Sequence, residues 1–319
     1  MRVGVFTPLL SHLPLEQALQ KLKSLHIDTV ELGTGNYPGD AHCNLSMLED
    51  SAALAAFLST LKRHAIQISA LSCHGNPLHP DPKRAEEART VSRKTILLAK
   101  KLGVSTVVDF SGCPGDSLQA KAPNWITCPW PPEYLEILDW QWKQVVEPYW
   151  IEQAAFAAQH GVRIAIEMHP GFVVYNPETM LRLRALAGPS IGCNLDPSHL
   201  FWQGIDPIAA VRLLGDCIFH VHAKDTQMYP ANLPRTGVLD TQIYTEERTR
   251  AWIFRTCGYG HDAAWWKEFV STLRMFGYDG VLSIEHEDSL LSANEGLAQA
   301  AQFLNELIPR EQPSAAWWV

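Results

Sequence analysis

Apolar runs rich in Val and Ile recur along the chain, and segments with helical spacing lie between them. Strands of a parallel sheet are covered on both faces, so we expect strands at 2–7, 28–34, 66–72, 104–110, 162–168, 190–196, 217–223 and 280–286. Apolar residues at helical intervals predict helices at 15–22, 46–64, 83–102, 133–160, 178–187, 206–214, 262–276 and 290–308. Glycines typical of helix C-termini follow five of them: Gly103, Gly161, Gly188, Gly215 and Gly277. This alternation predicts the α/β class and a closed (β/α)₈ TIM barrel, formed by residues 1–308 as one domain.

Two connections are long, and a short tail follows the last helix. Residues 111–132 follow the fourth strand, and an insertion at about 226–261 follows the seventh. Long loops on a rigid barrel usually carry function. The tail, 309–319, contains Trp317 and Trp318, so we expect it to dock on its own barrel or on a neighbouring copy in a homo-oligomer.

Acidic and imidazole side chains lie at the ends of four expected strands, in 164–169, 192–199, 218–225 and 281–288. Side chains two residues apart share a face of a strand, which pairs Glu167 with His169, His220 with His222, and Glu285 with Glu287. The sheet holds the deeper acid of each pair more rigidly, so we select Glu167 and Glu285 as metal ligands. His222 lies nearer the C-terminal mouth than His220 and is the better ligand of that pair. Of the other members, His220 is expected to be buried in the packed interior of the barrel, and His169 and Glu287 are candidates for contacting the substrate or supporting the ligands.

Asp196 precedes Pro197, which restrains it to an extended backbone at the end of its strand. A cap on the following helix is the alternative role, because Asp is common at helix starts. Together with Glu167, His222 and Glu285 it completes a set of three carboxylates and one imidazole. Such a set favours one divalent metal ion, Mn²⁺ or Mg²⁺ before Co²⁺ or Zn²⁺.

This ligand set predicts chemistry next to a carbonyl group. A metal with two open positions would accept adjacent oxygens of a hydroxycarbonyl compound and stabilise an enediolate. Glu167 and Glu285 come from well-separated strands, so one would remove a proton and the other would return it. The expected reaction is epimerisation or aldose–ketose isomerisation of a small carbohydrate.

At these residues the chain resembles the xylose isomerase-like TIM-barrel superfamily, often described as sugar phosphate isomerases and epimerases. The resemblance covers nearly the whole chain, and its most specific segments are 166–170, 195–199, 220–225 and 283–287. It implies Glu167, Asp196, His222 and Glu285 as metal ligands and the two glutamates as the acid/base pair. It also implies that His199 reaches the substrate or a metal-bound water.

The chain departs from the ketose epimerases of that superfamily after the seventh strand. There the family has a short stretch with a substrate-binding arginine, whereas this chain has the insertion, in which Arg255 or His261 would serve the substrate instead. A surface ion pair is the alternative for Arg255. The departure admits a substrate larger than a monosaccharide, so the alternative function is a lyase or dehydratase acting on an inosose or a keto-glycoside.

Other residues near the expected barrel mouth have weaker signals. His74 follows the third strand and would either bond a sugar hydroxyl or cap its loop, while Cys73 is expected to be a buried filler and Glu31 is a weaker site candidate. Tryptophans in the expected helices are more typical of packing. Three others, in loops or just past strand ends, are candidates for stacking on sugar rings: Trp125, Trp130 and Trp202.

Composition narrows the remaining classes of function. The net charge is −8 and no basic run exists, which argues against nucleic acid and against an endonuclease IV-like repair enzyme. No apolar run is long enough for a membrane span, and seven irregularly spaced cysteines fit reduced thiols, so we expect a cytoplasmic protein. A barrel that has lost its activity is disfavoured because all four ligand positions are filled.

Overall fold

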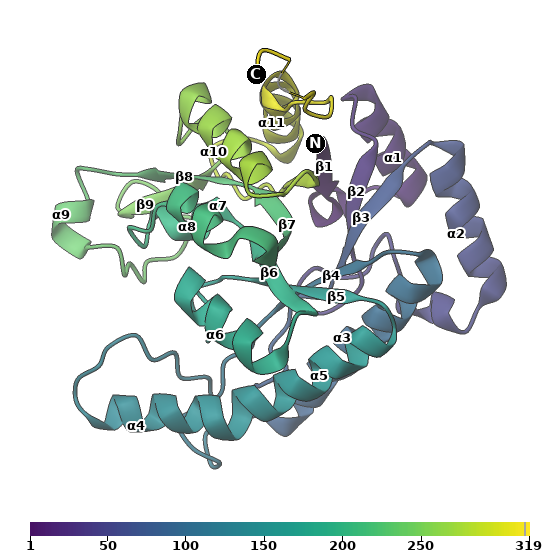
Figure 1. Ribbon diagram of the computed structural model, residues 1–319. Coiled ribbons are helices and arrows are strands. Elements are labelled where there is room, and N and C mark those ends of the chain that lie inside the picture. Colours follow the sequence, from purple (N-terminus) through teal and green to yellow (C-terminus); the bar gives the residue numbers. More distant parts are fainter. Residues whose placement is uncertain (316) are drawn as a thin grey trace.

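The eight expected strands form a closed, all-parallel barrel in the computed structural model, which describes residues 1–315 and 317–319 (Figure 1). Around the barrel the strands follow the order β1-β10-β7-β6-β5-β4-β3-β2. Their bounds are Arg2–Phe6 (β1), Thr29–Gly33 (β2), Gln67–Ser72 (β3), Thr106–Phe110 (β4), Arg163–Glu167 (β5), Ile191–Leu195 (β6), Ile218–Ala223 (β7) and Val281–Ile284 (β10). The predicted (β/α)₈ barrel is confirmed.

Helices surround the ring of strands, and most begin at a side-chain cap. The α-helices are Leu15–Ser24 (α1), Ser51–Arg63 (α2), Pro82–Leu102 (α3), Glu133–Trp140 (α4), Glu147–Gln159 (α5), Pro177–Ala187 (α6), Pro197–Phe201 (α7), Pro207–Leu214 (α8), Leu233–Thr236 (α9), Ala263–Met275 (α10) and Ala293–Leu307 (α11). Short 3-10 helices occupy Thr7–Leu10 (η1), Leu45–Leu48 (η2) and Gly215–Cys217 (η4), and a π-helix occupies Gln141–Val146 (η3). All five glycines expected at helix ends have positive φ.

Two expected helices differ in detail from the prediction. The 46–64 segment is divided because the Asp50 side chain accepts hydrogen bonds from the amides of Ala52 and Ala53, which starts a new helix there. The 133–160 segment is the continuous run of α4, η3 and α5, along the lower edge of Figure 1. Apolar periodicity predicts a helical run, but it does not reveal a cap or a π segment inside it.

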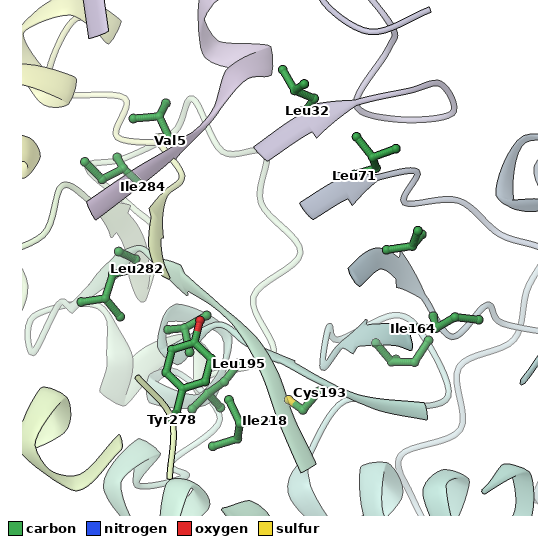
Figure 2. Close-up of a cluster of buried hydrophobic side chains, with 14 of the residues drawn as sticks. Val5, Leu32, Leu71, Ile164, Cys193, Leu195, Ile218, Tyr278, Leu282 and Ile284 are labelled. Carbon is green, nitrogen blue, oxygen red and sulfur yellow. The ribbon is translucent and has the colours of Figure 1, made fainter. Parts of the chain in front are cut away.

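The main hydrophobic core lies between the strands and the surrounding helices. Alternate strand residues such as Val5, Leu32 and Leu71 point outward from the ring of strands (Figure 2). Their neighbours in sequence face the barrel interior, where the apolar contribution is a small cluster of Ala70, Val108, Ala165 and Phe219. Above this cluster, toward the mouth, the interior carries polar side chains, and these form the candidate site.

The expected insertion after β7 is an ordered lobe with its own small core. A two-stranded antiparallel sheet, β8 (Asp225–Met228) and β9 (Trp252–Arg255), forms its base, and α9 lies at its outer end (Figure 1). Its hydrophobic cluster consists of Ala251, Trp252 and Phe254 from the lobe and Trp202, which directly follows α7. Trp202 and Trp252 stack with ring centroids 4.6 Å apart, so Trp202 is not free to stack on a sugar.

The tail docks on its own barrel through its first residues and not through its tryptophans: the Met1 ammonium donates to the Pro309 carbonyl, Arg274 donates to the Glu311 carbonyl, and the Gln312 amide donates to Asp279. Trp317 and Trp318 are 85% and 71% exposed. Docking on a neighbouring copy stays a prediction. Among the described residues, no helix is long and apolar enough to cross a membrane.

The seven cysteines are all free thiols. Six of them are buried, and Cys128, in the long 111–132 connection, is exposed. Burial, together with Asp40, raises the pKa of Cys43 to about 12. Burial likewise raises the pKa of Cys113 to about 12. Cys73 is fully buried, as expected for a filler.

Candidate metal centre

The barrel mouth brings together the four residues that the sequence selects as metal ligands. Glu167 ends β5, Asp196 follows β6, His222 lies in β7 and Glu285 follows β10. One ligand atom from each lies within 4.8 Å of all the others. The four strand ends therefore converge on a volume that fits a single ion.

Three buried polar atoms at this point make no well-directed hydrogen bond and lie only in close ionic contacts: Asp196 Oδ2, His222 Nδ1 and His199 Nε2. Buried charges are costly unless they are paired or bound to metal, and a bound cation would take Asp196 Oδ2 and His222 Nδ1 as ligands. Asp196 fulfils both of its expected roles, because Oδ1 accepts a hydrogen bond from the Ser198 amide at 2.8 Å and caps α7. Its second oxygen remains directed at the site.

Glu167 is held in place by neutral and imidazole donors. Its Oε2 accepts hydrogen bonds from His74 Nε2 and Asn194 Nδ2, each at 3.0 Å, and His199 Nε2 lies 3.3 Å from Oε1. Burial would raise the pKa of Glu167, but His222, His199 and His74 lower it well below its ordinary value. The residue is therefore a carboxylate, as a metal ligand or a general base requires. His74 thus lies at the mouth as predicted and touches Glu167.

Glu31 orients the His222 ring from inside the barrel. Burial would raise the pKa of Glu31, but His222 and His220 lower it well below its ordinary value. The ionised carboxylate only accepts hydrogen bonds, so the Nε2 atoms of His220 (2.9 Å) and His222 (3.0 Å) both donate to it. Ser283 adds a third donor at 2.6 Å. His222 is thereby fixed with Nδ1 toward the site, the arrangement found around metal-binding histidines.

Negative charge around His222 favours a cation at its Nδ1. That atom lies 3.0 Å from Glu285 Oε2 and 3.2 Å from Glu167 Oε2. Burial would lower the pKa of His222, but Glu31, Glu285 and Glu167 raise it well above its ordinary value. A proton on Nδ1 satisfies these carboxylates, and a divalent ion in the same place does so too.

Lys224 lies among the candidate ligands, and the sequence analysis did not select it. Its Nζ lies 3.1 Å from Asp196 Oδ2, 2.9 Å from Glu285 Oε2 and 3.0 Å from Glu287 Oε2. Burial would lower the pKa of Lys224, but Asp196, Glu285 and Glu287 raise it well above its ordinary value. The signal was available, because Lys224 follows His222 by two residues and so shares its face of β7.

A cavity of about 340 Å³ opens above the four ligands. Its lining includes His74, His169, His199, Lys224, Glu285 and Glu287. Burial, followed by the nearby His199, lowers the pKa of His169 to about 3, so this ring is neutral. Its Nδ1 lies 2.6 Å from the carbonyl of Pro170, to which a neutral ring donates, and this leaves Nε2 as an acceptor. The volume suits a monosaccharide-sized ligand.

Arg255 and His261 are not brought to this cavity. Arg255 pairs with Asp288 at 3.1 Å and with Gln227 at 2.6 Å, which matches the ion-pair alternative. His261 contacts Asp225 at 2.7 Å and stacks on Phe201. Both residues fasten the base of the insertion.

Phe254 of the insertion packs beside the site, and no pattern in the sequence singled it out. Its ring packs against His199, with centroids 5.3 Å apart, and Lys224 Nζ lies 4.7 Å from its centroid. Trp125 packs on Tyr175, and Trp130 is exposed, and neither lines the cavity. The aromatic residues that line the cavity itself are Phe6, Tyr37 and Phe110, and Phe254 of β9 packs beside it on His199 and Lys224.

Comparison with known proteins assigns the fold family. Residues 19–307 match the family model described as a xylose isomerase-like TIM barrel. The chain belongs to this family. It is 41% identical over 312 residues to the uncharacterized protein YfiH of Bacillus subtilis (strain 168), covering 97% of this chain and 99% of that protein. It is 24% identical over 203 residues to an inosose dehydratase of Geobacillus kaustophilus, covering 61% of this chain and 51% of that enzyme.

Solved structures of this family share the fold at low sequence identity. The probable 3-DHS dehydratase AsbF of Bacillus anthracis superposes with a TM-score of 0.66 at 16% identity, covering 98% of this chain and 100% of that chain. The zinc-bound IOLI protein superposes with a TM-score of 0.65 at 19% identity, covering 97% of this chain and 98% of that chain. A xylose isomerase-like barrel of Mycobacterium smegmatis in complex with magnesium superposes with a TM-score of 0.65 at 15% identity, covering 96% of each chain.

Proposed function

We propose that this protein is a divalent-metal-dependent enzyme that removes a proton next to a carbonyl group of a carbohydrate and returns it, as an epimerase or isomerase. The observation that carries the proposal is the convergence of Glu167, Asp196, His222 and Glu285, which bring one ligand atom each within 4.8 Å of the others. Three carboxylates and one imidazole suit Mn²⁺ or Mg²⁺, and Zn²⁺ or Co²⁺ also accept such ligands.

The four ligands would hold the ion, which supplies a Lewis acid that polarises the carbonyl oxygen. Asp196 and His222 are fully buried below the cavity, and Glu285 lines it. A substrate with a hydroxyl beside its carbonyl would lie over them, against His169 and His199. These two rings offer acceptor and donor atoms that suit sugar hydroxyls.

Glu167 and Glu285 are the acid/base pair of the proposal. One takes the proton from the carbon beside the carbonyl, which leaves an enediolate, and the other delivers a proton to the opposite face or to the neighbouring carbon. His74 and Asn194 hold the Glu167 carboxylate, while Lys224 holds that of Glu285. Both bases are therefore fixed before substrate binds, which favours catalysis.

A lyase or dehydratase is the second candidate, and it would use the same residues. Two relatives favour it: the inosose dehydratase and the probable 3-DHS dehydratase named above. In this reaction proton removal is followed by loss of the oxygen substituent on the next carbon. Lys224, whose ammonium group faces Glu285 and Glu287 and lines the cavity, would donate a proton to the departing oxygen.

Proton exchange tests the proposal for both candidates. The protein is loaded with Mn²⁺, Mg²⁺, Co²⁺ or Zn²⁺ and incubated in D₂O with ketoses, inososes and keto-glycosides. NMR should show deuterium entering beside the carbonyl, and an enone absorbance separates a lyase from an epimerase. No exchange with any substrate and metal would refute the proposal.

Matched variants assign the exchange to the site. Glu167→Gln and Glu285→Gln should each lower exchange by about 100-fold or more, because a positioned acid or base supplies 10²–10⁴-fold. Glu16→Gln is the control, since Glu16 is an exposed residue of α1 that pairs with Arg63. Full exchange in either site variant would exclude that glutamate as the base.

A further inference from the structure

A second cavity adjoins the metal site on the side of the insertion. Its volume is about 300 Å³, and its lining is His169, Tyr244, Ile253, Phe254, Glu287 and Ser289. It shares His169 and Glu287 with the cavity above the metal ligands. The two cavities are therefore neighbours that meet at these two side chains.

The insertion provides the aromatic wall of this second cavity. Tyr244 is 56% exposed and lies nearly parallel to Phe254, with centroids 5.7 Å apart and an interplanar angle of 25°. Phe254 is buried, with Trp252 packed against its edge at 5.2 Å. The buried guanidinium of Arg250 lies 4.6 Å from the Tyr244 centroid. The aromatic wall is thus supported from behind before any ligand binds.

Polar groups complete the lining of this cavity. The exposed Glu287 carboxylate offers acceptors, and the Ser289 hydroxyl both donates and accepts. Glu287 is also bound to Lys224, which ties this cavity to the metal ligands. A pyranose ring has an apolar face of C–H groups and a rim of hydroxyls, so it matches one aromatic wall and one polar wall.

We propose that the second cavity is a subsite for a second sugar ring, so that the substrate is a glycoside of two linked rings. The ring that bears the carbonyl lies over the metal ligands, and the second ring lies against Tyr244 with its hydroxyls toward Glu287 and Ser289. This inference rests on the proposed function for the first ring and adds the substrate class. It also gives the insertion a role, because Tyr244, Ile253 and Phe254 all belong to it.

Two matched substrates test the subsite. Maltose oxidised to a ketone at one ring carbon carries a second ring, and methyl glucoside oxidised at the same carbon lacks it. We expect kcat/KM for deuterium exchange by the metal-loaded protein to be at least about tenfold higher for the disaccharide, with most of the difference in KM. Equal values for the two substrates would overturn the subsite and leave the proposed function intact.

Variants of the cavity wall locate that preference. Tyr244→Ala should lower the ratio of the two kcat/KM values about tenfold, and Tyr244→Phe, which keeps the ring, should preserve it. Ser289→Trp fills the cavity from its polar side and should lower the ratio as well. Tyr134→Ala on α4 removes a partly exposed tyrosine outside both cavities and should change neither value. An unchanged ratio in both Tyr244→Ala and Ser289→Trp would refute the subsite.

Direct binding separates failure of the subsite from failure of the proposed chemistry. If no substrate shows deuterium exchange, calorimetry with the same two ligands measures whether the subsite binds a second ring. Binding of the keto-maltose that Tyr244→Ala weakens would support the subsite while the proposed reaction fails. Absence of binding by both ligands would overturn the subsite too.

Discussion

Glu31 lies inside the barrel, below the candidate metal centre, and touches none of the cavity. Its carboxylate accepts hydrogen bonds from His220, His222 and Ser283 and thereby fixes which nitrogen of His222 faces the site. Partners of this kind typically contribute a factor of 10–100 to metal affinity. The residue therefore acts through His222, as a positioning residue.

Glu31→Gln is predicted to weaken metal binding by about 10- to 100-fold. An amide carries no charge and brings its own N–H donors against those of the two histidines. Calorimetric titration with Mn²⁺ or Zn²⁺ measures the change, and Glu16→Gln should bind as the wild type does. An unchanged dissociation constant in a folded Glu31→Gln protein would exclude the positioning role.

Asp109 of β4 is a buried carboxyl group that the proposed chemistry does not use. It accepts hydrogen bonds from the Ser92 hydroxyl and from the amides of Gly75 and Phe110. Burial raises its pKa to about 6, and these donors only partly oppose that effect. The folded protein therefore holds this proton more tightly than the unfolded chain does.

Asp109 should make unfolding free energy depend on pH between about 4 and 6. Because the folded pKa is raised, its contribution is present at low pH and is lost as the pH rises through 6. About two pKa units correspond to about 3 kcal/mol. Urea unfolding across this range should give a flatter profile for Asp109→Asn than for the wild type. Asp139→Asn, an exposed control on α4, should give the same profile as the wild type. If Asp109→Asn kept the wild-type slope of unfolding free energy against pH, Asp109 would not be the group responsible.

Sequence reasoning selected the four ligands because each is tied to a strand end, where the alternation of faces can be counted. It ranked Glu31 low and passed over Lys224, since their importance comes from partners on other strands. Glu31 reaches His222 across 191 residues of sequence, and Lys224 reaches Glu287 across 63. Arg255 was the converse case, an expected substrate residue that the fold pairs with Asp288.

At the scale of elements, the insertion is the part of the fold that pattern alone could not describe. The periodicity of buried runs predicted all eight barrel strands. Strand β8 lacks such a run and β9 has only a short one, and both are fixed by packing of Trp252 on Trp202 and by antiparallel pairing with each other. The helix cap and the π segment inside two predicted helices are also not visible in the apolar periodicity, because they depend on local hydrogen bonds.

Trp252→Ala is predicted to loosen the insertion and leave the barrel folded. Removing a buried tryptophan costs about 3–5 kcal/mol, and this loss falls on the small core of the lobe. Hydrogen exchange should speed up in 226–255, and a protease should cut near 240, while β1–β7 and β10 stay protected. Trp317→Ala, at an exposed site, is the control. Uniform loss of protection would show that lobe and barrel unfold as one unit.

At the scale of the whole molecule, the candidate metal centre joins four consecutive strands of the barrel and, through Glu31, a fifth strand that is not adjacent to them. Its ligands come from β5, β6, β7 and the end of β10, and Glu31 adds β2. An ion held by these residues binds the folded state only. It therefore stabilises the closed barrel as a unit.

Metal at 100 times its dissociation constant should raise the unfolding free energy by about 2.7 kcal/mol. Tm should then rise by several degrees, and excess chelator should reverse the rise. Asp196→Asn should lose most of the shift, whereas Asp139→Asn should keep it. A Tm that no divalent ion changes would contradict metal binding at this site.

The exposed thiol of Cys128 can be labelled in the wild-type protein, without any mutation. The other six thiols are buried in the folded protein, so a maleimide dye should react at this position first. The label would sit in the long connection after β4, in the same connection as Trp125. The emission of this dye would change when the connection moves. The rate at which a second dye attaches to a buried thiol would measure how fast the core opens.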